Sequence, residues 1–99
     1  MGLINYDSGD FDKLIEKEAV VDFYTTWCGP CRMFGPVFEK SSVDRNINFV
    51  KVDVDSNVDI ARKYGVMTIP TVILFRNGVE VKRNIGFMSI EEFNKFLDM

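Results

Sequence analysis

Residues 19–31 read Ala-Val-Val-Asp-Phe-Tyr-Thr-Thr-Trp-Cys-Gly-Pro-Cys, and this stretch decides the fold. Its first part, Ala19–Thr25, is mostly apolar and rich in β-branched and aromatic residues, which is typical of a strand covered on both faces. Pro30 stands where a helix accepts proline in its first turn, and helical sequence continues to about Val43. The stretch therefore predicts a buried strand, a turn that carries two cysteines, and a helix.

The remaining sequence alternates between strand-like and helix-like segments. The expected strands are Leu3–Tyr6, Ala19–Thr25, Ile47–Asp53, Thr71–Phe75 and Val79–Ile85. Four helices are expected. The first begins after the cap Asp10, and the second begins at Pro30 and has a kink at Gly35-Pro36. The third runs from Val58 to Tyr64, and the fourth begins after the capping box Ser89–Glu92. Asn77-Gly78 favours a type I′ turn, so the last two strands form a hairpin. The order β-α-β-α-β-α-β-β-α predicts an α/β fold, a three-layer α/β/α sandwich around a mixed central sheet.

Length and charge exclude several classes of protein. A chain of 99 residues has room for one core, so we expect a single domain over residues 1–99. Its net charge of -3 argues against nucleic acid or anionic lipid as a partner. No apolar run approaches the roughly 20 residues that span a bilayer. No signal peptide is evident at the N-terminus, so we expect a cytoplasmic location. The polar outer faces of the expected helices predict a monomer.

The two cysteines, Cys28 and Cys31, are the chain's sharpest chemical feature. With no histidine and only two cysteines, the chain is short of the roughly four ligands that zinc or an iron–sulfur cluster usually takes. A disulfide across so short a loop constrains the unfolded chain only weakly. A redox role is therefore the main hypothesis. A metal shared between two chains and a buried, chemically silent pair remain as alternatives.

The position of Cys28 at the start of a helix explains how it becomes reactive. Unpaired backbone N–H groups and the positive end of the helix dipole stabilise a thiolate there, which lowers the pKa of the thiol. Cys28 comes first and should be the more exposed, so we assign it the attack on a substrate disulfide. Cys31 lies one helical turn further on and is the natural resolving thiol.

The motif Trp27-Cys28-Gly29-Pro30-Cys31 resembles the active-site signature of the thioredoxin family, and the resemblance extends over essentially the whole chain. Further positions that match the family pattern are Asp22, Pro36, Lys51, Ile69-Pro70-Thr71 and Gly86. The resemblance implies the thioredoxin fold. It also implies that Ile69-Pro70 is a cis-proline loop facing the cysteines, although sequence alone favours a trans bond.

The resemblance also implies roles for Asp22 and Lys51. A carboxylate in the middle of an apolar strand is costly to bury, so the pKa of Asp22 should be raised. Near Cys31 it would take the proton of that thiol as it attacks. The alternative is an Asp on a solvated strand face. Lys51, on the neighbouring strand, would reduce the cost of burial, or it is an ordinary surface lysine.

By the same resemblance, Trp27, Ile69, Pro70 and Gly86 form a shallow apolar groove next to Gly29 and Pro30, in which a substrate strand pairs with the backbone of Ile69. The alternative for Trp27 is a place in the core. Phe87 follows Gly86 where many relatives carry a small residue, and Met67-Thr68 also departs from commoner family forms. These departures affect the expected choice of partner.

The pair Gly29-Pro30 bears on the direction of the reaction. Strongly oxidising relatives commonly carry a histidine between the cysteines, and neither residue here can be charged, so we expect a reductant. The resemblance implies protein substrates with accessible disulfides and recycling by thioredoxin reductase, with no cofactor held by the chain itself. A docking subunit with incidental cysteines, and an oxidase or isomerase of the same fold, are the competing hypotheses.

The acidic stretch Asp53–Asp59 resembles the start of a calcium loop. Val58 replaces the glycine that such a loop requires, and Tyr64 replaces its final glutamate. We therefore interpret the stretch as the end of a strand followed by a helix cap, and we expect no metal site.

Overall fold

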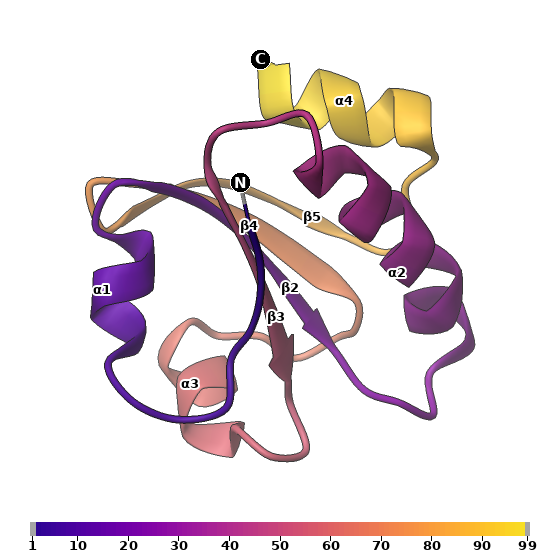
Figure 1. Cartoon of the computed structure of the whole chain (residues 1–99). Helices are drawn as coiled ribbons and strands as arrows, with labels where there is room; N and C mark the ends of the chain where they lie inside the picture. The colour runs from indigo at the N-terminus through magenta and orange to yellow at the C-terminus, as the bar shows by residue number, and fades with distance from the viewer. Residues whose placement is uncertain (1, 99) are drawn as a thin grey trace.

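The computed structural model describes residues 2–98, so Met1 and Met99, the two ends of the predicted domain 1–99, lie outside the described residues. A five-stranded sheet carries helices on both faces (Figure 1). Its strands are β1 (Gly2–Asn5), β2 (Glu18–Tyr24), β3 (Asn48–Asp53), β4 (Thr71–Arg76) and β5 (Val79–Ile85). The helices are α1 (Phe11–Ile15), α2 (Gly29–Ser42), α3 (Val58–Lys63) and α4 (Ile90–Asp98). This is the predicted element order, and where both ends of an element were predicted they agree to within one residue.

The strand order β1-β3-β2-β4-β5 places β2 at the centre of the sheet. It pairs in parallel with β3 and antiparallel with β4, so the sheet is mixed, as predicted. In this register Phe23 lies opposite Thr71, and Tyr24 lies opposite Asp53. The segments that leave β2 and β3 and the segment that enters β4 therefore meet at one edge of the sheet. That edge carries the cysteines.

Two apolar layers enclose the sheet. α1 and α3 cover one face and α2 and α4 the other (Figure 1). Phenylalanine rings fill much of the second layer, where Phe93 lies 5.1 Å from Phe34 and Phe38 lies 5.2 Å from Phe49 between ring centroids. Such edge-on ring pairs add to the stabilisation from burial. α2, which begins at the cysteines, is thus packed firmly against the sheet.

The caps of the helices agree only in part with the sequence-based predictions. Ser89 and Glu92 form the predicted capping box: the Glu92 amide donates to Ser89 Oγ at 3.1 Å, and the Ser89 amide donates to Glu92 Oε1 at 2.8 Å. Asp10 stands at the N-cap of α1, but its side chain makes no capping hydrogen bond. Its predicted position at the N-cap is therefore confirmed, but the side chain makes no capping bond, and burial of Phe11 and Ile15 stabilises this five-residue helix.

The hairpin at Asn77-Gly78 has the geometry that the sequence predicts. Both residues have a positive φ, 54° for Asn77 and 78° for Gly78, as a type I′ turn requires. Arg76 and Val79 pair across it. Among the described helices, none combines the length and the apolar character that crossing a bilayer demands.

Candidate active site

A disulfide joins Cys28 to Cys31 at the start of α2. Cys28 is the N-cap, with extended backbone, and the Cys31 amide donates to Cys28 Sγ at 3.2 Å. The Cα atoms of the two cysteines lie 5.2 Å apart. The first turn of the helix thus brings the two sulfurs together and directs a backbone N–H at the sulfur of Cys28. The same N–H would stabilise negative charge on Cys28 in the reduced protein.

Both cysteines are nearly buried. Cys28 is 7% exposed and Cys31 4%, so the difference has the predicted sign but is small. Gly29 and Pro30, between them, are exposed. Cys28 Sγ also lies 4.0 Å from the carbonyl oxygen of Ile69. A substrate disulfide therefore reaches Cys28 only by docking closely against this edge of the sheet.

The loop before β4 faces the cysteines, and its Ile69–Pro70 peptide bond is cis, as the family resemblance implies. The Gly86 amide donates to the carbonyl oxygen of Pro70 at 2.8 Å. Gly86 has a φ of 104°, which side-chain-bearing residues rarely adopt, so this position favours glycine. Ile69, Pro70 and Gly86 are thus brought together beside Cys28.

Trp27 is 69% exposed, so the alternative of a core tryptophan is wrong. Its Nε1 donates to Asp55 Oδ2 at 2.8 Å, and the amide of Asp55 donates to Asp53 Oδ1 at 3.0 Å. Sequence reasoning missed Asp55, which it interpreted only as part of a strand end and a helix cap. The available signal was topological: β2 and β3 are parallel, so the residues that follow them lie at the same edge.

Asp22 is 1% exposed, in the middle of β2. Among residues 2–98 neither of its carboxylate oxygens has a hydrogen-bond partner. Burial raises the pKa of Asp22 from 3.8 to about 7, with the charge of Lys51 acting in the opposite direction and that of Glu39 in the same direction. The alternative of a solvated strand face is therefore wrong.

Lys51 lies opposite Asp22 in the register of β2 and β3, and its side chain is only 14% exposed. Its Nζ is 3.2 Å from Glu39 Oε2 and 4.9 Å from the centre of the Tyr24 ring. The alternative of an ordinary surface lysine is wrong as well. These contacts place the ammonium group at the side of α2.

A cleft of about 290 Å³ connects Lys51 with Cys31. Its lining includes Cys31, Pro36, Glu39 and Lys51. The sequence pattern singled out all of these residues except Glu39. Pro36, for which the sequence predicted only a kink, lies inside α2 and forms part of the cleft wall.

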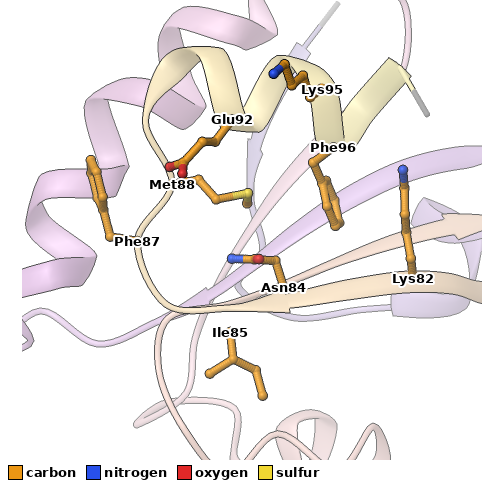
Figure 2. Close-up of a pocket in the computed structure, with 8 residues that line it drawn as sticks. All are labelled: Lys82, Asn84, Ile85, Phe87, Met88, Glu92, Lys95 and Phe96. Carbon is orange, nitrogen blue, oxygen red and sulfur yellow. The ribbon is translucent and has the colours of Figure 1, made fainter.

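The two departures from the family pattern both expose apolar surface. Met67 is 94% exposed and Phe87 42%. The Phe87 ring stands edge-on to Phe34 of α2, with 6.5 Å between ring centroids. Figure 2 shows Phe87 turned toward α2, at one end of a pocket between β5 and α4 that contains neither cysteine. The surface of Phe87 therefore adds apolar area near the start of α2.

The described part of the chain contains no group of three or more His, Cys, Asp or Glu side chains that could hold a metal ion.

Comparison with known proteins identifies relatives over the full length of the chain. The family model described as thioredoxin matches residues 3–99. A thioredoxin of Staphylococcus epidermidis is 42% identical over 101 residues, covering 99% of this chain and 97% of the relative. A thioredoxin of Staphylococcus aureus is 41% identical with the same coverage. The crystal structure of a reduced Schistosoma mansoni thioredoxin pre-protein superposes with a TM-score of 0.89 at 38% identity, covering 99% of this chain and 97% of that one.

A helix-terminal Cys28–Cys31 disulfide, faced by a proline loop on this mixed sheet, defines a protein-disulfide oxidoreductase. The chain belongs to the thioredoxin family, and it has the thioredoxin fold.

Proposed function

We propose that this protein reduces disulfides in other proteins, with Cys28 as nucleophile and Cys31 as resolving thiol. The observation that carries the assignment is the hydrogen bond of 3.2 Å from the Cys31 amide to Cys28 Sγ. Of the two sulfurs, it is Cys28 Sγ that accepts the hydrogen bond from a backbone N–H of the first helical turn. A thiolate on Cys28 is therefore the better stabilised one, and it is the species that attacks.

The reaction is a pair of thiol–disulfide exchanges. The Cys28 thiolate attacks one sulfur of the substrate disulfide and forms a mixed disulfide, while the other substrate sulfur leaves as a thiolate. Cys31 then loses its proton and attacks Cys28 Sγ. The second substrate sulfur leaves, and the Cys28–Cys31 disulfide forms. Two electrons pass from the cysteine pair to the substrate.

Asp22 is the proposed acceptor of the proton from Cys31. A pKa of about 7 suits this role, because the carboxyl group both takes up and releases a proton near neutral pH. Lys51 moderates the cost of a charge on Asp22, since its ammonium group lowers the pKa that burial raises. The cleft between Cys31 and Lys51 supports a route by which the proton leaves to solvent.

Substrates dock along the proposed shallow groove of Trp27, Ile69, Pro70 and Gly86, next to Gly29 and Pro30; Trp27 is exposed, Ile69 and Gly86 are half-buried, and Pro70 is buried. An extended substrate segment pairs with the backbone of Ile69 and thereby brings its disulfide to Cys28. Ile69 is favoured for this pairing because its carbonyl oxygen already lies 4.0 Å from Cys28 Sγ.

The resemblance to the family supports a proposal for the physiological setting. The protein works as a cytoplasmic monomer, and a thioredoxin reductase returns the Cys28–Cys31 disulfide to the dithiol. The uncharged pair Gly29-Pro30 favours a reductant over an oxidase, because no positive charge between the cysteines stabilises the reduced form.

The first test is reduction of insulin disulfides with dithiothreitol as electron donor. The native protein is expected to accelerate precipitation of the insulin B chain, and Cys28→Ser to abolish the acceleration. A folded native protein without effect would overturn the reductase assignment and favour a docking subunit. A reduction potential near that of disulfide isomerases or oxidases would instead overturn the direction of the reaction.

A further inference from the structure

Glu39 contacts the charged pair beside the active site, although no part of the mechanism above uses it. Its Oε2 lies 3.2 Å from Lys51 Nζ, and its side chain is half exposed and lines the cleft. Within residues 2–98, the carboxylate in ion-pair contact with Lys51 is that of Glu39 and not that of Asp22. The more deeply buried carboxylate is thus the one left without a partner.

The strand register alone would favour the opposite arrangement. Lys51 and Asp22 are paired positions of adjacent parallel strands. An ion pair between them would satisfy a buried carboxylate, whereas the pair with Glu39 is partly exposed and gains less. A lysine stem of four carbons has the freedom to reach either group. Something must therefore hold the ammonium group toward α2.

The contacts of Lys51 on the α2 side show what holds it. Glu39 is on α2, and a Cβ added at Gly35, one turn earlier on that helix, would lie 3.8 Å from Lys51 Nζ. The stem of Lys51 also brings Nζ to 4.9 Å from the Tyr24 ring. At that distance a Cβ would be in ordinary van der Waals contact with Nζ, so the ammonium group lies against this turn of α2, within reach of Glu39.

We propose that Glu39 is a positioning residue, which holds the Lys51 ammonium group against α2 and so keeps it from forming an ion pair with Asp22. This inference rests on the proposed role of Asp22 as proton acceptor. If Lys51 were paired with Asp22, the carboxyl group would stay ionised at neutral pH and would lose its ability to exchange a proton there. Glu39 thus keeps the pKa of Asp22 near neutral pH, where the resolving step needs a group that exchanges a proton.

The charged and titratable groups on this side of Asp22 come from three elements. They are Tyr24 of β2, Lys51 of β3, and Arg32, Glu39 and the disulfide-bonded Cys31 of α2. On β4, the position opposite Asp22 is the apolar Val72. Of the charged groups, Lys51 and Glu39 are the two whose charges act on the pKa of Asp22. Replacing Glu39 therefore removes one of the two charges that act on the pKa of Asp22.

The test is a titration of the Asp22 carboxyl carbon by NMR in the disulfide form, in which neither cysteine titrates. The variants are Glu39→Gln, Lys51→Met and the double variant. The midpoint for Asp22 is expected to fall by about one pH unit in Glu39→Gln, because the freed ammonium group turns to Asp22. In the Lys51→Met background, the same replacement is expected to shift the midpoint by less than half as much.

The matched control is Glu16→Gln, which removes an exposed carboxylate at the end of α1, on the opposite face of the sheet. It should leave the Asp22 midpoint unchanged. An unchanged midpoint in Glu39→Gln would overturn the proposal. Equal shifts with and without Lys51 would also overturn it, since Glu39 would then act only through its own charge.

A parallel kinetic measurement separates this inference from the proposed function. In the reduced protein, the rate at which Cys31 resolves a mixed disulfide is measured against pH for the native chain, Asp22→Asn and Glu39→Gln. A profile that moves to lower pH in Glu39→Gln supports the proposal. If the native chain forms no mixed disulfide at all, the reductase function fails, whereas the NMR titration still decides whether Glu39 positions Lys51.

Discussion

Trp27 Nε1 donates a hydrogen bond of 2.8 Å to Asp55 Oδ2, and this bond ties the exposed indole beside Cys28 to the segment that follows β3. An aromatic ring that is 69% exposed would otherwise be free to change rotamer. Holding the ring before a substrate arrives lowers the entropy lost on docking. Asp55 therefore belongs to the proposed docking groove although it does not reach the cysteines.

Replacing Asp55 with Ala should loosen Trp27. A hydrogen bond to a charged group is worth about 1.5–3 kcal/mol when sheltered, and exposure reduces this, so we expect KM for insulin to rise about threefold. Trp27 is the chain's only tryptophan, so its fluorescence anisotropy reports on this site alone and should fall. Asp59→Ala, on the exposed side of α3, is the control. An anisotropy equal to that of the native protein would contradict the prediction.

Asp22→Asn should stabilise the disulfide form, and more so at high pH. The folded protein keeps the Asp22 proton up to about pH 7, whereas the unfolded chain releases it near pH 3.8. Between these values the folded state binds more protons, so the free energy of unfolding of the native chain falls as pH rises. Asparagine has no charge to bury. The difference in free energy of unfolding between Asp22→Asn and the native chain should therefore grow between pH 4 and 7. Above pH 7 it should level off at about 4 kcal/mol.

Urea unfolding of the native and Asp22→Asn proteins at pH 4.5 and pH 8 measures this difference. Asp7→Asn, which removes an exposed carboxylate, serves as control. A stabilisation by Asp22→Asn of the same size at both pH values would show that the carboxyl group does not titrate between them.

Cys31→Ser should trap the intermediate of the proposed reaction. The Cys28 thiolate still attacks the substrate, but no second thiol releases it, so a covalent complex accumulates. Non-reducing electrophoresis and intact mass measure this complex. Cys28→Ser should form less than a tenth as much, because the N–H of the first helical turn stabilises a thiolate on Cys28 and not one on Cys31. Equal amounts of mixed disulfide from both variants would overturn the assignment of Cys28 as nucleophile and Cys31 as resolving thiol.

Ser89→Ala should destabilise the protein by about 1 kcal/mol, because it removes one of the two reciprocal bonds of the capping box of α4. For a chain of this length that corresponds to a Tm lower by about 4–8 °C. Asp10→Ala is the matched comparison, since Asp10 occupies an N-cap without a capping bond. Thermal unfolding followed by circular dichroism should show the larger loss for Ser89→Ala, and equal losses would contradict the prediction.

Most of the fold was accessible from the sequence because local signals and periodicity agreed. The apolar run before Cys28, the pair Asn77-Gly78 and the Ser89–Glu92 box each specify a local geometry, and each is present. Asp10 occupies the N-cap that the sequence predicts but makes no capping bond, because a residue type that favours caps does not ensure the bond, and tertiary packing decides the first helix.

The active site was accessible only in part. The cysteine pair is local, so spacing predicts its position in the chain. Asp55 and Glu39 touch Trp27 and Lys51 across 28 and 12 residues of sequence respectively. Such contacts depend on strand order and on the direction of a side chain, which a single sequence does not display. The small difference in exposure between Cys28 and Cys31 has the same origin, because the loop at Ile69 covers Cys28 from a distant part of the chain.

The hairpin turn at Asn77-Gly78 has a practical consequence for using this protein as a tool. β4 runs from Thr71, at the cysteine edge, to Arg76, so the turn is displaced from that edge by the length of a six-residue strand, about 20 Å. A tether placed there would leave Trp27 and Cys28 pointing away from its support. The molecule could thus be fixed to an electrode, or fused to a reporter, with its electron-carrying end facing the solution.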